Sequence, residues 1–151
     1  MKNKIFIITG ESSGDKLASN IVPYFNNKQY KILGIGSEAL RKKNIKLIFN
    51  SSKISFMGIA DVIKNIFFIV KKLKFTLNVI KKFKPNVIFS IDAPDFSFHI
   101  ANKIKKIFPK IKIIHLVAPS IWAWREGRAS HIRKFIDHLL VLFPFEEKIF
   151  N

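Results

Sequence analysis

The sequence KIFIITGESSGD at residues 4–15 decides the fold. Lys4–Thr9 is a short run of β-branched and aromatic residues, which is typical of a strand buried on both faces of a parallel sheet. Gly10–Gly14 follows as a turn, and the sequence from about Asp15 to Tyr24 has the pattern of a helix. A strand, a glycine turn and a helix in this order predict the first half of a βαβ unit.

The rest of the chain repeats this alternation. Further strands are expected at Tyr30–Ile35, Lys46–Phe49, Asn86–Ile91, Lys112–Val117 and His138–Leu142. Helices are expected at Glu38–Lys42, Ile59–Phe83, Phe96–Ile107 and Arg125–Ile136. Six strands with helical crossovers predict an α/β fold, a Rossmann-like doubly wound and mostly parallel sheet in one domain spanning residues 1–151.

The composition excludes several classes of protein. With 48% hydrophobic residues and 16 phenylalanines, the chain is no disordered basic tail. The absence of cysteine excludes disulfide frameworks, thiolate nucleophiles and Cys-ligated zinc. Two readings of the net charge of +17 remain open. Lys, Ile, Asn and Phe share A/T-rich codons, so base composition alone produces this excess; equally, a lysine-rich surface attracts anionic membranes and phosphorylated ligands.

No apolar run approaches the roughly 20 residues of a transmembrane helix, which predicts a soluble or peripheral protein. The basic start Met1–Lys4 resembles a signal peptide, but its apolar run stops at Gly10. The lysine-studded helix expected at Ile59–Phe83 has two readings: one face packs on the core, or an apolar face with basic flanks lies on a membrane surface.

Carboxylates are concentrated where ligands bind in such sheets, at the carboxyl ends of the strands. Of ten acidic residues, five are expected in strand-end loops: Glu11, Asp15, Asp92, Asp95 and Glu146. The turn at 10–15 is neither a Gly-x-Gly-x-x-Gly nor a Walker sequence. Its backbone N–H groups suit a phosphate or sugar, but an ordinary turn with Ser13 or Asp15 as helix N-cap also explains it.

Two later loops give sharper signals. In Ile91-Asp-Ala-Pro-Asp-Phe96, Pro94 forces a turn and Asp95 suits a helix N-cap, whereas Asp92 is either a general base or a hydrogen-bonded loop aspartate. The loop 118–125 holds both tryptophans and Arg125. The tryptophans either fill the core or line a site for sugar rings or acyl chains, and an arginine here can pair with a phosphate. His115 is expected in the core, and the other histidines show no metal-ligand spacing, so no metal site is predicted.

Together these motifs resemble the lipid-A-disaccharide synthase family over the whole chain. The motifs are Gly-Glu-Ser-Ser-Gly-Asp at 10–15, Met57-Gly58, Asp-Ala-Pro-Asp-Phe at 92–96, Pro-Ser-Ile-Trp-Ala-Trp-Arg at 119–125 and Pro-Phe-Glu at 144–146. The resemblance implies the amino-terminal half of a GT-B glycosyltransferase. Such an enzyme transfers diacylglucosamine from its UDP conjugate to diacylglucosamine 1-phosphate with inversion, forming a β-1,6 disaccharide without a metal cofactor.

The same resemblance implies roles for single residues. Asp92 is the expected catalytic base. The expected substrate contacts are Glu11, Ser13, Asp95, Trp122 and Arg125. The expected structural turn residues are Gly10, Gly14, Met57, Gly58, Pro94 and Pro119.

The implied partners are acylated glucosamine lipids, an anionic membrane surface on the cytoplasmic side, and a carboxyl-terminal nucleotide-sugar domain that this chain lacks. Without that domain we expect no transferase activity. Two alternatives remain: a stand-alone nucleotide-binding module, and a basic protein of membrane surfaces or nucleic acids. The sequence carries no recognisable nucleic-acid motif, so no nucleic-acid partner is expected.

Overall fold

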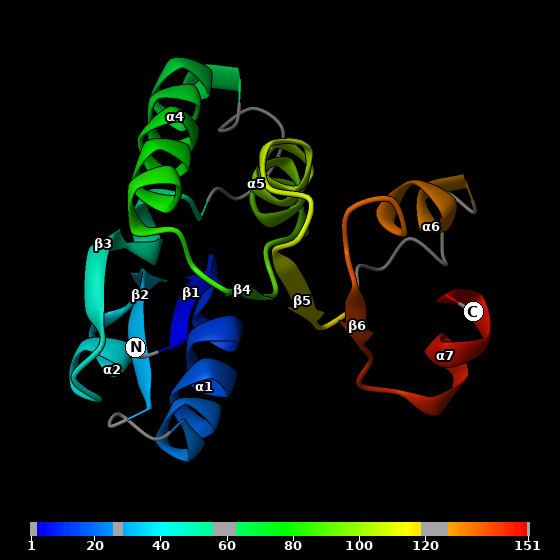
Figure 1. Cartoon of the computed structure of the whole chain (residues 1–151), viewed down its shortest axis with the longest axis horizontal. Coiled ribbons are helices and arrows are strands. Elements are labelled where there is room, and N and C mark those ends of the chain that lie inside the picture. The colour runs from blue at the N-terminus through cyan, green and yellow to red at the C-terminus, as the bar shows by residue number, and fades with distance from the viewer. Residues whose placement is uncertain (1–2, 26–28, 56–62, 119–126, 151) are drawn as a thin grey trace.

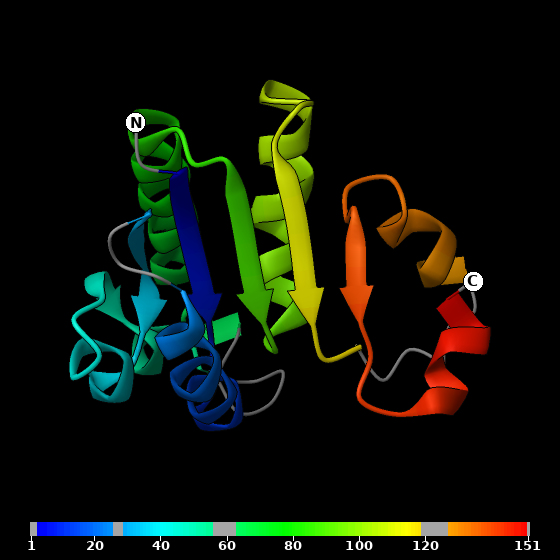
Figure 2. The same cartoon turned by 60° about the horizontal axis from the view of Figure 1, so that its bottom comes forward.

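The computed structural model describes residues 3–25, 29–55, 63–118 and 127–150. Its centre is a six-stranded sheet with the order β3-β2-β1-β4-β5-β6, in which every neighbouring pair is parallel. Figure 2 shows the strand arrows pointing the same way. This is the strand order of a Rossmann-like sheet, so the predicted fold class is confirmed.

All six predicted strands are present, within two residues of their expected ends. They are β1 (Asn3–Thr9), β2 (Tyr30–Gly36), β3 (Lys46–Asn50), β4 (Val87–Ile91), β5 (Lys112–Leu116) and β6 (His138–Leu140). The α-helices are α1 (Ser12–Ile21), α2 (Glu38–Arg41), α4 (Ile66–Phe83), α5 (Pro94–Ile107), α6 (Gly127–Ile132) and α7 (Pro144–Phe150). Two short 3-10 helices are η1 (Val22–Tyr24) and η2 (Ser51–Lys53).

Helices cover the two faces of the sheet unequally (Figure 1). On one face, α4 and α5 pack over a core that includes Phe6, Ile88 and Ile113. On the other face, α1 and α2 cover a smaller core around Ile7 and Ile91. Successive residues of each strand therefore enter different cores, which explains why the strands are apolar throughout.

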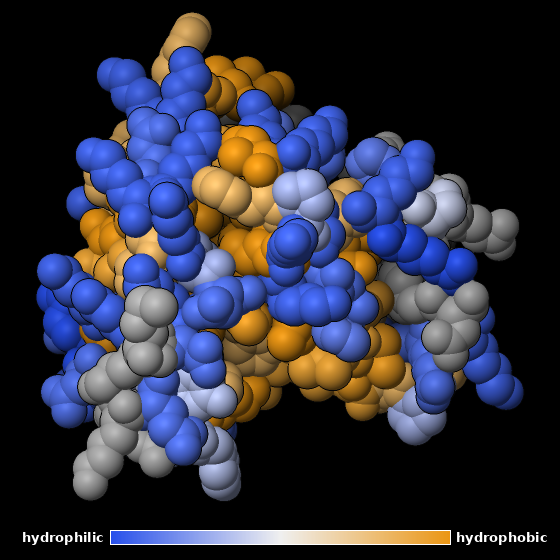
Figure 3. Space-filling model, viewed as in Figure 1, coloured by the Kyte–Doolittle hydropathy of each residue, from blue (hydrophilic) through white to orange (hydrophobic). Residues whose placement is uncertain are grey.

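The second face has no helix over β5 and β6 among the residues that the structure describes. Leu116 pairs with Leu140 there, and Leu140 remains 46% exposed. Figure 3 shows the result as a continuous apolar surface between α1 and α7, while hydrophilic residues cover most of α4. Within the described ranges, no helix is long and apolar enough to cross a membrane.

Several predicted helix ends were wrong. α1 begins at Ser12 rather than Asp15, and α5 begins at Pro94 rather than Phe96. The helix expected from Ile59 is interrupted at Asn65, and α4 starts only after it; residues 59–62 lie outside the described ranges. α6 ends at Ile132, four residues earlier than expected, and β6 ends at Leu140. Apolar periodicity marks the buried face of a helix but not the residue at which its hydrogen bonding begins or stops.

Candidate functional site

The loops after β1 and β4 meet at the point where the strand order reverses. Chain connections leave β1 and β4 on opposite sides of this point, which is where ligands bind in open α/β sheets. A Cβ added to Gly10 would lie 2.2 Å from Ala93 Cβ. One added to Gly14 would lie 2.8 Å from the Ile91 carbonyl oxygen and 3.1 Å from Asp92 Cβ. Glycine at both positions therefore lets the two loops touch.

Asp92 and Ala93 have unusual backbone angles at this junction. Their φ angles are 57° and 48°, in the left-handed region that non-glycine residues rarely adopt. Asp92 N donates to the Leu116 carbonyl oxygen (3.0 Å), which ties the bend to the end of β5. Pro94 then starts α5, and its ring fixes φ near the helical value. Strain of this kind occurs where the surrounding structure holds a functional group in place.

The Asp92 carboxylate is half-buried and already oriented. Ser13 Oγ donates to Asp92 Oδ2 (2.6 Å), and Ala93 N donates to Asp92 Oδ1 (2.9 Å). Each carboxylate oxygen keeps a second lone pair, so an entering hydroxyl can still donate its proton here. The arrangement suits a base that is held in one rotamer by a partner from α1.

The alternative in which Ser13 or Asp15 caps α1 is wrong, and Asp15 has a different structural role. The N-cap of α1 is Glu11, and its side chain makes no capping hydrogen bond. Asp15 is only 5% exposed and accepts hydrogen bonds from three different segments. The donors are Thr9 Oγ1 (2.5 Å), Ser51 Oγ (2.8 Å) and Ser37 N (3.0 Å). The carboxylate thus joins the ends of β1, β2 and β3 beneath the glycine turn.

Asp95 is also no N-cap. Ala93 occupies that position without a side-chain hydrogen bond, Pro94 follows, and Asp95 lies in the first turn, where a carboxylate is favourable beside the positive helix end. Glu11 and Asp95 are both exposed, and they line the same hollow next to Ala93. The two predicted acidic contacts therefore face the same hollow beside the Asp92 loop.

Glu146, the last of the five strand-end acids, is structural. It is 5% exposed, and its Oε2 accepts from Leu142 N and Phe143 N (3.1 Å each). A glutamate at the third position of a helix that reaches back to the preceding backbone is half of a capping box. It fixes the start of α7 rather than a ligand.

His115 was predicted in the core and is fully buried in β5. Its Nδ1 lies 2.7 Å from Ser90 Oγ on β4, and the Phe98 ring packs against it with centroids 4.6 Å apart. Burial lowers the pKa of His115 to about 4, although the nearby Asp92 acts in the opposite direction. The imidazole is therefore neutral at pH 7 and sits directly below the Asp92 loop.

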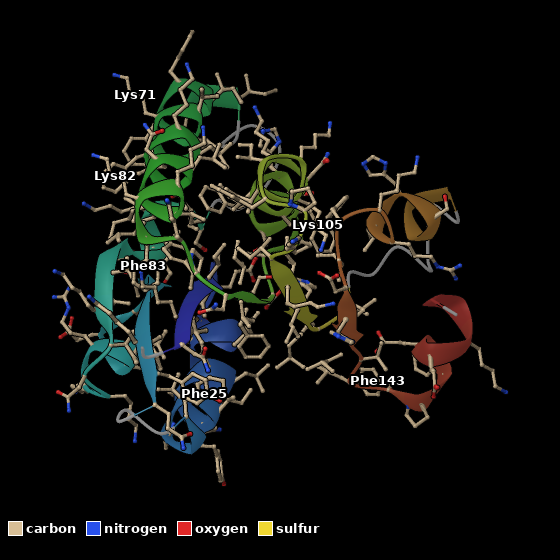
Figure 4. All side chains as sticks on the ribbon, in the orientation of Figure 1. Phe25, Lys71, Lys82, Phe83, Lys105 and Phe143 are labelled. Carbon is tan, nitrogen blue, oxygen red and sulfur yellow. The ribbon has the colours of Figure 1, made fainter. Side chains whose placement is uncertain are left out.

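An apolar patch with basic neighbours covers the first turns of α4. The α4 apolar patch consists of exposed residues that helical spacing brings to one face, namely Ile63, Ile66, Phe67 and Val70. Phe67 is 82% exposed. Lys71, which follows Val70, points outward from the same helix (Figure 4), and Lys72 lies over the Phe68 ring.

Five predicted site residues lie outside the described ranges: Met57, Gly58, Pro119, Trp122 and Arg125. Sequence reasoning in turn missed the donors to Asp15 and the Ser90–His115 pair. Thr9 carried one usable signal, since it is a polar residue that ends an otherwise apolar strand. Among the residues described, no group of three or more His, Asp or Glu side chains is gathered to hold a metal ion.

Comparison with known proteins decides the family. Residues 5–151 match the family model described as lipid-A-disaccharide synthetase. The chain belongs to this family. A lipid-A-disaccharide synthase from Rickettsia bellii strain OSU 85-389 is 39% identical over 150 residues, which are 98% of this chain and 39% of that relative. One from Rhodospirillum centenum is 33% identical over 97% of this chain and 37% of the relative. The chain thus spans about two fifths of the length of these synthases.

Solved structures with low sequence identity share the fold. MurG from Acinetobacter baumannii superposes with a TM-score of 0.61 at 10% identity, over 95% of this chain and 41% of that one. A glycosyltransferase from Rickettsia africae gives 0.62 at 18% identity, over 97% and 38%. A UDP-N-acetylglucosamine 2-epimerase from Rickettsia bellii gives 0.63 at 14% identity, over 99% and 41%. The α/β half of a GT-B fold is therefore the architecture of this lipid-A-disaccharide synthetase family member.

Proposed function

We propose that this chain forms the acceptor-side domain of a lipid-A-disaccharide synthase. The complete enzyme transfers 2,3-diacylglucosamine from its UDP conjugate to 2,3-diacylglucosamine 1-phosphate and releases UDP. Family membership and the names of the relatives support this reaction. The observation that carries it in the structure is the Asp92 carboxylate, held by Ser13 at the reversal of strand order.

Asp92 serves as the general base in this proposal. The acceptor 6-hydroxyl oxygen attacks the anomeric carbon of the UDP-sugar while the bond from that carbon to the UDP oxygen breaks. The hydroxyl proton passes to Asp92, so the new β-1,6 bond forms with inversion in one displacement. Removal of this proton by a positioned base contributes about 10²- to 10⁴-fold to such rates.

Ser13 and two acidic residues, Glu11 and Asp95, orient the acceptor. We call these two carboxylates the acidic rim. The Ser13 hydrogen bond holds Asp92 Oδ2 and leaves its other lone pair for the substrate hydroxyl. Glu11 and Asp95 accept hydrogen bonds from sugar hydroxyls. Trp122 and Arg125 remain proposed contacts to the substrate.

The leaving UDP needs positive charge, which helix N-termini and basic residues supply in this proposal without a metal or other cofactor. In this proposal the nucleotide-sugar is held by the part of the synthase beyond the two fifths that this chain spans. Activity therefore requires both halves.

We further propose that the enzyme works at the cytoplasmic surface of the inner membrane, since its substrates are lipids. The α4 apolar patch with its flanking lysines supports this location. Apolar side chains enter the headgroup region, and lysines are attracted to anionic lipids.

A chimera tests the proposed reaction. The segment of the Rickettsia bellii relative that aligns with this chain over 150 residues is replaced by this chain. With UDP-diacylglucosamine and diacylglucosamine 1-phosphate, the chimera is expected to form disaccharide and UDP, and the isolated chain to form neither. The parent synthase is the positive control. A folded chimera without activity beside an active parent would contradict the proposal.

A further inference from the structure

A cavity of about 320 Å³ opens beside the Asp92 loop. It lies between η2, the first turns of α4 and the start of α5. Its lining comes from these segments and the glycine turn: Glu11, Ile54, Ile69, Leu73, Ala93, Pro94, Asp95, Phe96 and His99. Its volume is at the lower end of small-molecule sites, which span about 300–1,000 Å³, so it suits one slender group rather than a whole glycolipid.

The inner walls of the cavity are apolar and fixed. Ile54 and Phe96 are each 8% exposed and belong to the core beneath α4 and α5. The cavity is therefore an open end of the hydrophobic core. Most of its lining side chains can contact only an apolar ligand favourably.

The inward-facing residues of α4 become less buried where the helix passes over this cavity. Thr76 and Ile80 are fully buried, whereas Leu73 and Ile69, one and two turns earlier, stay half-buried because the cavity lies beneath them. The row of inward-facing residues continues to Ile66, which is 44% exposed and belongs to the α4 apolar patch. An unbroken apolar path thus joins the patch to the cavity.

The charge at the cavity is opposite to that of the chain. The chain carries +17, yet the charged residues among those that line the cavity are Glu11 and Asp95. Burial and nearby Lys103 lower the pKa of His99, which disfavours its positively charged form. Two carboxylates repel a phosphate and accept hydrogen bonds from neutral hydroxyl groups.

We infer that this cavity binds one acyl chain of the acceptor glycolipid, with the sugar hydroxyls at Glu11 and Asp95 and the phosphate directed away from them. This inference rests on the proposed function. Ala93 and Pro94 line the cavity and directly follow Asp92. A chain bound here therefore holds its sugar beside the base, and the acidic rim sets which end of the sugar faces it.

The test measures binding to the 151-residue chain and needs no turnover. Dodecyl β-glucoside is titrated below its micelle concentration by calorimetry, and saturable binding at one site is expected. Ile69→Trp fills the cavity and is expected to weaken binding at least tenfold. Asn78→Trp places the same ring on the exposed side of α4, outside both the lining and the α4 apolar patch, so it is the matched control and is expected to stay within twofold. Equal affinity of both variants and the parent would overturn the inference, as would absence of binding.

Dodecyl phosphate tests the acidic rim. The lysine-rich surface attracts this anion, but we expect Ile69→Trp to leave the affinity for dodecyl phosphate unchanged. We also expect dodecyl phosphate not to displace the bound glucoside. Glu11→Gln with Asp95→Asn is expected to let the phosphate compete. Displacement of the glucoside by the phosphate from the unchanged chain would overturn the proposed orientation.

A measurement on the unchanged chain tests the site even if Ile69→Trp does not fold. A glucoside with a spin label at the chain end is expected to broaden the methyl resonances of Ile54 and Leu73 selectively. Equal broadening of Leu142, an exposed leucine outside the cavity, would contradict the site. An inactive chimera with intact glucoside binding would refute the proposed function alone, and an active chimera without glucoside binding would refute this inference alone.

Discussion

Ser13 on α1 and Asp92 after β4 are 79 residues apart in the chain, and a 2.6 Å hydrogen bond joins them across the reversal of strand order. The bond fixes a carboxylate at the place where the fold binds ligands. In the active chimera, Asp92→Asn keeps the shape but removes the base. We expect disaccharide formation to fall about 10²- to 10⁴-fold, measured as UDP release. Unchanged turnover would remove Asp92 from the mechanism.

Ser13→Ala separates positioning from chemistry. It removes one hydrogen bond to a charged group, about 1.5 kcal/mol, so we expect about a tenfold loss of turnover. Combined with Asp92→Asn, it is expected to add little further loss, because the serine acts through the aspartate. Additive effects in the double variant would show that Ser13 has an independent role.

Asp15→Asn is expected to destabilise the isolated chain by about 2–3 kcal/mol in urea unfolding, since it removes a buried carboxylate that accepts from Thr9, Ser37 and Ser51. Asp95→Asn makes the same chemical change on the exposed first turn of α5 and is expected to stay within about 0.5 kcal/mol. Equal stability of the two variants would contradict the structural role of Asp15.

Gly10→Ala is expected to cost about 1–3 kcal/mol, because its new Cβ would meet Ala93 Cβ at 2.2 Å. Ala93→Gly in the same chain removes the clashing atom at a residue with φ of 48° and is expected to restore most of the stability. Thermal unfolding of the two single variants and the double variant measures this coupling. If the double variant is as unstable as Gly10→Ala, the contact between the loops is not the cause.

His115 makes stability depend on pH. Its pKa is about 4 in the folded chain, against 6.5 for an ordinary histidine, so the unfolded chain takes up the proton first. Its stabilising contribution is present above pH 6.5 and is lost as the pH falls towards 4, by on the order of 3 kcal/mol. His115→Asn is expected to flatten the pH dependence of unfolding in this window. The exposed His138→Asn is the control and should leave the slope unchanged.

Phe67→Ser is expected to lower binding to vesicles of anionic phospholipid about tenfold, since a largely exposed aromatic side chain no longer enters the interface. Tyr24, 88% exposed in η1, gives the matched control Tyr24→Ser, which should bind as the parent does. Flotation of the chain with vesicles measures both. Equal loss in the two variants would show that the α4 apolar patch is not the contact surface.

The strands were predictable because each is a continuous apolar run that both cores require. Helix starts were harder to predict: Glu11 precedes α1 without a side-chain cap, and α5 begins at Pro94 after Ala93, which also has no side-chain cap. Asp92 was recognisable as a polar residue that ends a buried strand. The role of Asp15 was not predicted, because its three donors come from segments that only the sheet brings together. The cavity beneath Ile69 escaped prediction for the same reason.

The pairing of β1 with β4 joins two segments of this chain, one before and one after the reversal of strand order. Residues 3–50 form three strands with short local crossovers, and the remaining strands are built in the same way after residue 86. Each segment can form its contacts early, because closing short loops costs little entropy. The Ser13–Asp92 bond requires both segments to have docked. The reactive carboxylate is thus assembled only when folding is complete, and partly folded chains do not contain the oriented base.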